Sequence, residues 1–195
     1  KAYGMARANR FKKSGGRIFL MTGDGELQEG QIWESLQPVA NERLGEITVI
    51  VDHNKYQSDT LVSAVSDLGP LEDKFRAFGW EVRRGDGHDP RVIREALKHF
   101  ASVTNRPKVF IADTIKGKGV SFMEGIACGD QTYQFHAGAP SVENYLKATS
   151  ELLTRVNGAL AALGHEAVAL ESAPLPVRIT PAKREKIVLA YGGEL

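Results

Sequence analysis

The sequence contains a single cysteine, Cys128, so no disulfide can form within its 195 residues. It also lacks an excess of either charge, because 25 Lys and Arg against 24 Asp and Glu leave a net charge of +1. Binding to nucleic acid or to an anionic membrane is therefore not favoured, since both call for basic residues in excess. No apolar run approaches the roughly 18 residues that span a bilayer, and no signal peptide is found. One cysteine is typical of a reducing compartment, so we expect a cytoplasmic protein with neither a membrane nor a nucleic-acid partner.

Glycine is the residue in excess. The chain has 20 glycines in 195 residues, about a tenth, whereas ordinary proteins have about 7%. This excess indicates tight turns that carry the backbone close to a ligand. The hydrophobic share of 42% and the charged share of 25% are ordinary for a globular chain and exclude general disorder.

Short apolar runs alternate along the chain with amphipathic helical patterns. Runs without polar alternation are typical of buried parallel strands, and they lie at Ile18–Met21, Ile47–Val51, Trp80–Val82 and Val109–Ile115. Helices are predicted over 1–14, around Ile32–Leu44, over Pro70–Phe78 and from Asp89-Pro90 to about Ala101. The alternation predicts an α/β fold with a doubly wound, mostly parallel sheet and flanking helices. Pro38 lies inside the second helical pattern and predicts a kink or a split there.

The same patterns predict three parts in the chain. Residues 1–140 form the sheet domain, whose N-terminus we expect to be missing because the chain starts inside a helical pattern without a cap residue. Within it, residues 116–140 form a loop long enough to be functional or disordered. Residues 141–180 are a long amphipathic helix, Ser141–Leu163, and an extended linker. Residues 181–195 begin a second domain with a helix at Pro181.

Oxygen-bearing side chains follow two of the predicted strands. Asp24, in Gly23-Asp24-Gly25, follows the first strand, and Asn54 follows the second. Ligands of open parallel sheets bind outside the carboxyl ends of the strands, and one helical crossover joins these two, so both side chains can point into one crevice. A carboxylate, an amide oxygen and a backbone carbonyl suit Mg²⁺, which usually shares its coordination shell with phosphates. The flanking glycines and the N-terminus of the next helix favour a diphosphate, so the residues predict a metal–diphosphate site.

A second Gly-Asp-Gly provides an internal comparison, because the triplet alone is usually only a turn. Gly85-Asp86-Gly87 also precedes a helix, but the residue 30 positions after Asp86 is Lys116, whereas Asn54 stands 30 positions after Asp24. We interpret the second copy as a loop with a helix cap. The first copy differs because a strand precedes it and a strand-end Asn follows it.

Longer motifs around these residues resemble the transketolase family. The segment Gly23–Glu34, GDGELQEGQIWE, together with Asn54 resembles its thiamine diphosphate motif. Phe75–Trp80, Asp86–Asp89 and Ile115–Glu124 are also similar, so the resemblance covers about residues 1–140. Residues 184–191 resemble the opening of the pyrimidine-binding domain of the family, which implies that residues 181–195 begin such a domain.

The resemblance implies a transketolase that depends on thiamine diphosphate and Mg²⁺ and transfers a two-carbon ketol unit between sugar phosphates. The chain would supply the half of the site that holds the metal and the diphosphate. Asp24, the Asn54 side chain and the Tyr56 carbonyl would bind Mg²⁺. The Gly25 amide and Asn54 would contact the diphosphate.

Four more residues receive roles from the same resemblance. Glu29 and Glu34 would join a buried carboxylate network that links two cofactor sites across a dimer, Glu29 counting among the cofactor-binding residues. His136 would be the catalytic residue that faces diphosphate and substrate, and Lys116 would lie near the cofactor. By themselves, the two glutamates fit a solvated helix face better than a buried network, and His136 fits a surface histidine equally well.

Other chemically capable residues receive structural interpretations. We expect His53, at a strand end, and His88, before a helix cap, to be structural. Lys118 belongs to a solvated turn, and Trp33 and Trp80 belong to the core.

The resemblance also implies a partner. The glutamate that binds the aminopyrimidine of the cofactor belongs to the pyrimidine-binding domain, so these 195 residues need such a domain or subunit for turnover. A homodimer or a heterotetramer would supply it.

Alternative functions remain open at the level of sequence. Within the enzymes, 1-deoxyxylulose-5-phosphate synthase is one, and the first component of a 2-oxo acid dehydrogenase is another, although Glu29 argues against the latter. A non-catalytic cofactor-binding subunit or fragment is an alternative of another class. A general nucleotide-binding module is disfavoured, because neither G-x-G-x-x-G nor G-x-x-x-x-G-K-[ST] follows a strand.

Overall fold

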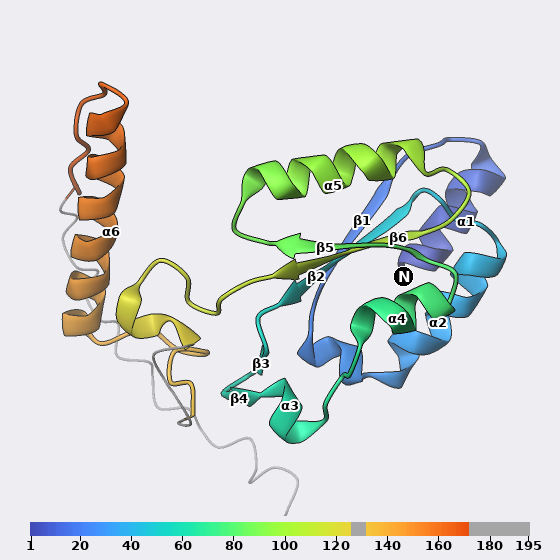
Figure 1. Cartoon of the computed structure of the whole chain (residues 1–195), viewed down its shortest axis with the longest axis horizontal. Helices are drawn as coiled ribbons and strands as arrows, with labels where there is room; N and C mark the ends of the chain where they lie inside the picture. The colour runs from blue at the N-terminus through green and yellow to red at the C-terminus, as the bar shows by residue number, and fades with distance from the viewer. Residues whose placement is uncertain (126–131, 172–195) are drawn as a thin grey trace, which may run out of the picture. The chain divides into compact units, whose positions relative to one another are not determined.

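A four-stranded parallel sheet forms the centre of the first structural unit, Lys1–Leu152 (Figure 1). The structure, a computed structural model, describes residues 1–125 and 132–171. The strands lie in the order β1-β2-β6-β5, and all three pairings are parallel. Their bounds are Ile18–Gly23 for β1, Ile47–His53 for β2, Glu81–Asp86 for β5 and Lys108–Asp113 for β6. The predicted α/β fold class with a mostly parallel sheet is confirmed.

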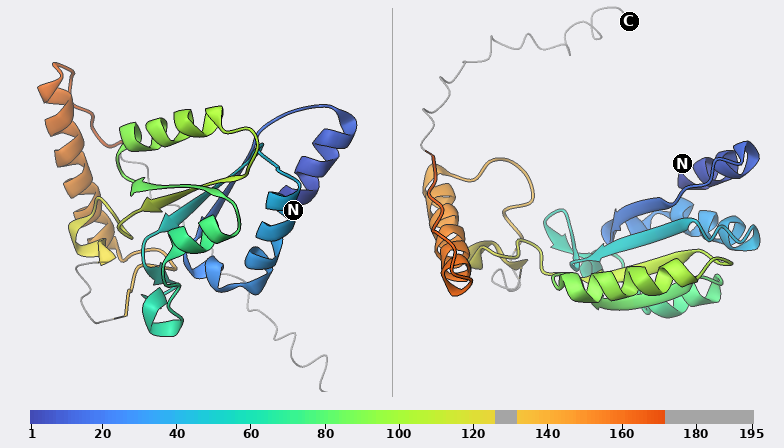
Figure 2. Two further views of the ribbon diagram at one scale, coloured as in Figure 1. Left: turned by 45° about the vertical axis from the view of Figure 1, so that its right-hand side comes forward. Right: turned by 90° about the horizontal axis from the view of Figure 1, so that it is seen from above.

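Helices cover both faces of the sheet, because successive strand side chains point to opposite faces. Val49 and Val51 belong to the larger core cluster with α1, α2 and α4, whereas Ile50 packs against the smaller cluster beneath α5. Figure 1 and the left view of Figure 2 show α5 on one side and α2 and α4 on the other. The helices span Ala2–Lys12 for α1, Gly30–Asn41 for α2, Leu71–Ala77 for α4 and Pro90–Ser102 for α5.

The helix α2 runs unbroken through Pro38, so of the two predicted outcomes the split was wrong, and the kink stays a prediction. A proline inside a helix removes one backbone hydrogen bond but leaves the others intact. Leu36 and Val39 on either side of it are buried in the main core, and this packing holds the helix together.

The second Gly-Asp-Gly also lies at the end of a strand, contrary to our interpretation of it as a loop. The strand β5 continues through Gly85 to Asp86, because Asp86 still pairs with Asp113 of β6. A preceding strand therefore does not distinguish the two copies. What distinguishes the two copies is the set of hydrogen-bond donors to each aspartate side chain.

Two small elements that the sequence pattern did not predict follow Asn54 directly. A hairpin of β3, Tyr56–Gln57, and β4, Thr60–Leu61, leads into a single helical turn, α3, Val62–Val65. Strands of two residues are too short to show a period of alternation.

Between β6 and the long helix that follows it, the described residues contain little regular structure. They include a 3₁₀ turn, η2, at Ser121–Met123, and another 3₁₀ turn, η1, Gly25–Gln28, follows β1. The predicted helix over Ser141–Leu163 is confirmed as α6, Val142–Ala162, which extends into the second unit, Leu153–Leu195. Residues 164–171 form no helix or strand. Cys128 and the helix predicted from Pro181 lie outside the described residues, so the division into three parts stays a prediction.

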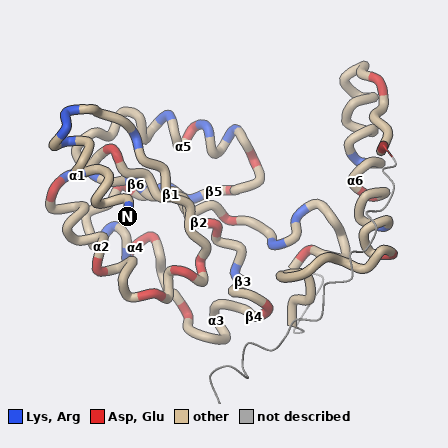
Figure 3. The backbone as a smooth tube through the Cα atoms, turned by 180° about the vertical axis from the view of Figure 1, so that it is seen from behind, with Lys and Arg blue, Asp and Glu red and all other residues tan. Residues whose placement is uncertain are grey.

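Charges of both signs are mixed on the surface. Figure 3 shows acidic and basic residues interspersed along α5, in keeping with the net charge of +1. Within residues 1–125 and 132–171, no helix is long and apolar enough to cross a membrane.

The turn at buried Gly45 packs tightly against the backbone of Thr104. A Cβ atom placed on Gly45 would lie 2.0 Å from the Thr104 carbonyl oxygen, so backbone would have to move. We expect Gly45→Ala to lower the free energy of unfolding by about 1–3 kcal/mol in urea denaturation. Gly4 in α1 has no atom within 4 Å of such a Cβ, and Gly4→Ala should instead add up to about 1 kcal/mol. Equal effects of the two variants would contradict the packing argument.

Candidate functional site

Asp24 is a buried carboxylate at the carboxyl end of β1. Its side chain is only 1% exposed. The Gly25 backbone N–H donates to Oδ1 over 2.9 Å, and the Lys55 backbone N–H donates to Oδ2 over 2.6 Å. Its own backbone N–H donates to the Asp52 carbonyl, 3.1 Å away. Asp24 is thus held on one side by its own turn and on the other by the loop after β2.

Asn54 lies in that same loop, so the structure brings together the two motifs that are 30 residues apart. The register of β1 and β2 sets Gly23 opposite Asp52, which places both strand ends at one edge of the sheet. The Asn54 amide donates to Asp52 Oδ2 over 3.2 Å, and its Oδ1 accepts the Tyr56 backbone N–H over 2.9 Å.

The surroundings of Asp24 fit a cation. Burial raises the pKa of Asp24, and the backbone N–H of Lys55, the nearby His53 and the N–H of Gly25 counteract only part of this rise. A bound cation would remove the cost of burying this charge. In the described part of the chain, no three His, Cys, Asp or Glu side chains converge as a metal cluster. A metal at Asp24 would therefore need amide, carbonyl or ligand oxygens, as Mg²⁺ accepts.

Gly25 is glycine for a reason that sequence reasoning missed. A Cβ atom on Gly25 would lie 2.7 Å from Cβ of Gln57 in β3. The hairpin after Asn54 thus packs directly on the Gly-Asp-Gly turn. Beside it, Gln57 Oε1 is buried without a hydrogen-bond partner among the described residues. The neighbouring Gly23 N–H donates to Glu26 Oε2 over 2.7 Å.

The two other glutamates of the motif lie on or next to α2 and are exposed in the single chain. Glu29 is the N-cap residue of α2 and makes no side-chain cap hydrogen bond. Glu34 is exposed on the helix. The carboxylate network across a dimer stays a prediction.

Lys116 and His136 meet across the long loop. The Lys116 ammonium lies 3.2 Å from His136 Nδ1 and 5.0 Å from the centre of the Tyr133 ring. His136 is exposed, and Lys116 is half-buried. Lys116 and Asn54 both line a cavity of about 700 Å³ at the carboxyl ends of β2 and β6.

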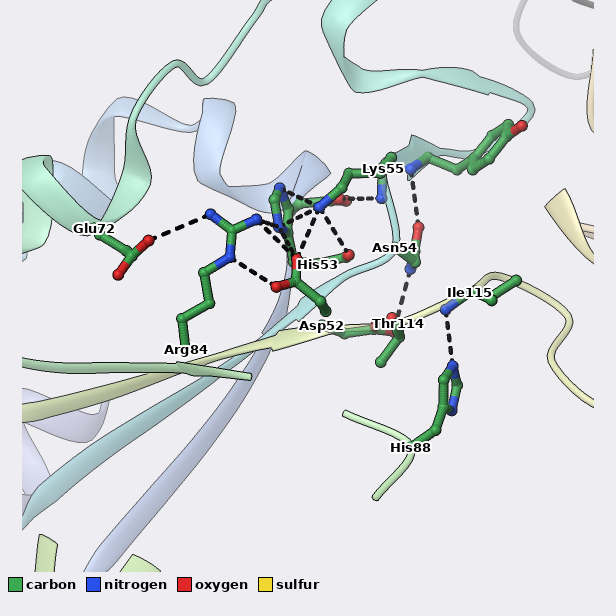
Figure 4. Close-up of polar contacts among 12 residues, drawn as sticks. Asp52, His53, Asn54, Lys55, Glu72, Arg84, His88, Thr114 and Ile115 are labelled. Carbon is green, nitrogen blue, oxygen red and sulfur yellow. Dashed lines mark hydrogen bonds and ion pairs between the residues drawn. The ribbon is translucent and has the colours of Figure 1, made fainter. Parts of the chain in front are cut away.

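A second polar network lies on the α4 face of the strand ends and centres on Asp113. Figure 4 labels its members Glu72, Arg84, His53 and Lys55. Arg84 donates to both of its oxygens over 2.7 and 2.9 Å and also lies 3.5 Å from Glu72 of α4. The Lys55 ammonium and His53 Nδ1 each lie 3.0 Å from Asp113 Oδ1. Burial alone would raise the pKa of Asp113, but the hydrogen bonds from Arg84, Lys55 and His53 outweigh it and hold the pKa well below its usual range.

The same network holds Lys55 in an unusual conformation. Its φ of 74° lies in the left-handed region, which a lysine adopts at some cost. This conformation directs the Lys55 N–H to Asp24, while the ammonium donates to Asp113 and lies beside the His53 ring. His53 belongs to this network, and burial followed by the charge of Lys55 lowers its pKa. The sequence did not predict the role of Asp113 and Arg84 in this network, because only the β5–β6 pairing brings the two residues together.

The low pKa of Asp113 leads to a prediction about acid stability. A carboxylate whose pKa is lower in the folded state stabilises the fold above its unfolded pKa, and this contribution disappears as the pH falls through the folded value. We expect Asp113→Asn to cost about 1 kcal/mol at pH 7, since the side chain is 38% exposed and screened by water. The difference in the free energy of unfolding between Asp113→Asn and the unmodified chain should shrink below about pH 4. Urea denaturation of both proteins from pH 2.5 to 7 measures this difference.

Asp73→Asn is the matched control for that experiment. Asp73 lies on α4 with its side chain 74% exposed and pairs only with Arg76 in the described residues. It should change the free energy of unfolding little at any pH. A loss in Asp113→Asn that persists at pH 3 would contradict the ionic role of Asp113.

Comparison with known proteins identifies the family. The sequence model of the family "Transketolase, thiamine diphosphate binding domain" matches residues 4–149. The chain is 41% identical over 124 residues to a 6-deoxy-6-sulfo-D-fructose transketolase subunit of Clostridium sp., which covers 64% of this chain and 45% of the relative. It is 33% identical over 153 residues to an apulose-4-phosphate transketolase subunit of Phocaeicola vulgatus, covering 78% and 52%.

Solved structures of transketolases share this fold. The crystal structure of transketolase from Campylobacter jejuni superposes with a TM-score of 0.57 at 24% identity, covering 82% of this chain and 22% of that one. The chain spans about half the length of the curated subunits that it matches. Because the family model matches most of its length, the chain belongs to the transketolase family as a thiamine diphosphate-binding domain.

Proposed function

We propose that the chain holds Mg²⁺ and the diphosphate of thiamine diphosphate in a transketolase that moves a two-carbon ketol unit between sugar phosphates. The observation that carries the proposal is the buried Asp24 carboxylate, which is hydrogen-bonded to the backbone of the Asn54 loop. Membership of the family supports the cofactor. The relatives are named as transketolase subunits that act on sugar derivatives, which supports the reaction class.

Three oxygens of the chain would bind the metal: one of Asp24, Oδ1 of Asn54 and the carbonyl of Tyr56. The Gly25 N–H would contact the diphosphate together with Asn54. Gln57 Oε1, buried beside Gly25 without a partner among the described residues, offers an acceptor for a metal-bound water. Carboxylate, amide and carbonyl oxygens are the ligands that Mg²⁺ prefers when phosphate completes its shell.

The remaining residues would act on the charge and protons of the ligands. Lys116 would neutralise the diphosphate at the cavity wall. His136, whose Nδ1 faces the Lys116 ammonium, would hold a proton at Nε2 and offer this N–H as a hydrogen bond to a substrate oxygen. Thiamine diphosphate supplies the carbanion chemistry when it is bound.

A partner would complete the site. We propose that a pyrimidine-binding domain or subunit closes over the cofactor, in a homodimer or a heterotetramer located in the cytoplasm. Both relatives bear names that describe them as subunits of a transketolase, which supports a divided enzyme. Glu29 and Glu34 are exposed in the single chain and available for the carboxylate network across such an interface.

Calorimetric titration with thiamine diphosphate tests the site. With Mg²⁺ and the pyrimidine-domain partner present, the unmodified protein should bind the cofactor, and EDTA should abolish binding. Asp24→Asn should lose binding by at least about a hundredfold, because the metal loses its charged ligand and one N–H donor faces the new amide.

The matched control is Asp67→Asn, which replaces a carboxylate that caps the Gly69 N–H in an exposed loop. It should bind like the unmodified protein. Circular dichroism checks that Asp24→Asn is folded. Metal-independent binding, or full binding by a folded Asp24→Asn, would refute the site.

A ketol-transfer assay on the same complex tests the reaction. His136→Ala should lower kcat by about a hundredfold or more, the usual size of a lost hydrogen-bond donor to a developing charge, with a smaller change in cofactor affinity. Cofactor binding without ketol transfer in the unmodified complex would instead indicate a non-catalytic cofactor-binding subunit.

A further inference from the structure

Two turns at the carboxyl edge of the sheet are hydrogen-bonded to each other. The turn after β5 contains Gly87 and His88, and the turn after β6 contains Ile115. The Gly87 N–H donates to the Asp113 carbonyl over 2.8 Å, and the Ile115 N–H donates to His88 Nε2 over 2.8 Å. Figure 4 shows the His88 ring directed at the Ile115 nitrogen.

The imidazole of His88 is an acceptor in this contact. Since Nε2 accepts the Ile115 N–H, the ring proton lies on Nδ1. The His88 backbone N–H donates to Asp86 Oδ1 over 2.7 Å, which fixes the turn that carries the ring. A Cβ on Gly87 would lie 2.5 Å from Thr114 Cγ2, so the two turns are also in close van der Waals contact.

The turn after β6 is held from its other side as well. The Thr114 hydroxyl donates to Asp52, whose second oxygen accepts the Asn54 amide. Thr114 and Ile115 are therefore fixed between His88 and Asp52. The next residue, Lys116, extends from this fixed segment to His136.

All of these groups border one space. His88, Thr114, Ile115 and Lys116 line the cavity of about 700 Å³ that also contains Asn54 and Asp52. A displacement of the Ile115 backbone would therefore move the Lys116 ammonium at the wall of this cavity.

We propose that His88 is a positioning residue: its neutral imidazole holds the Ile115 backbone and so aims Lys116 at the diphosphate and at His136. The proposal rests on the proposed function for the role of Lys116. His88 therefore does more than fill the structural role expected from its place before a helix cap. It acts through the backbone of its neighbour.

Variants of His88 test this role in the complex with the pyrimidine-domain partner. His88→Ala should weaken thiamine diphosphate binding in the presence of Mg²⁺ by about fivefold, the effect of one lost hydrogen bond. His88→Gln should recover most of the affinity, because its Oε1 is as many bonds from Cβ as Nε2 and accepts the same N–H. Hydrogen exchange of residues 114–118 should be faster in His88→Ala than in the unmodified protein and His88→Gln.

His99→Ala is the matched control, since it removes a histidine of α5 that contacts Glu81 and Arg83 away from the cavity. It should leave both affinity and exchange at 114–118 unchanged. Unchanged exchange and affinity in His88→Ala, or no recovery in His88→Gln, would overturn the proposal. If exchange is faster in His88→Ala but the unmodified complex does not bind the cofactor, the hydrogen bond holds the turn and the proposed function is wrong. The positioning role of His88 would then be wrong as well, because it depends on that function.

Discussion

The hydrogen bond from the Lys55 backbone N–H to the buried Asp24 carboxylate is the interaction on which the site depends. It joins the loops after β1 and β2, and its acceptor has only one other N–H donor among the described residues, that of Gly25. Losing one donor to a buried carboxylate costs about 1–3 kcal/mol or more. Lys55 presents this N–H at a positive φ, and the bond of its ammonium to Asp113 favours that conformation. Stability of the loop and geometry of the site therefore rest on the same contacts.

Neighbouring residues at the end of β2 serve opposite faces of the sheet, because strand side chains alternate. His53 joins the network of Asp113 and Arg84 on the face that α4 covers. Asp52 lies on the other face and binds Asn54 and the turn after β6 at the cavity wall. One strand end thus contributes both to the structural network and to the wall of the proposed ligand site.

Local patterns in the sequence were sufficient to predict the main elements and the meeting of Asp24 with the Asn54 loop. Buried parallel strands are recognisable as short apolar runs, and their carboxyl ends must share an edge. The reason for Gly25 was not predictable, since it depends on Gln57 in a hairpin too short to show a period. The full length of β5 was not predictable either, because the polar residues at its end belong to the strand only through their pairing with β6.

The sequence by itself determined the α/β class, the order of strands and helices along the chain, and the chemistry available at the strand ends, because these depend on local periodicity and residue type. The tertiary structure alone decided which strands are neighbours and hence which polar groups meet. Asp113 finds Arg84 and Lys55, and His88 finds Ile115, only after the order β1-β2-β6-β5 is formed. Hydrogen bonds act over about 3 Å, whereas their partners here are 27 to 58 residues apart, so no local pattern records them.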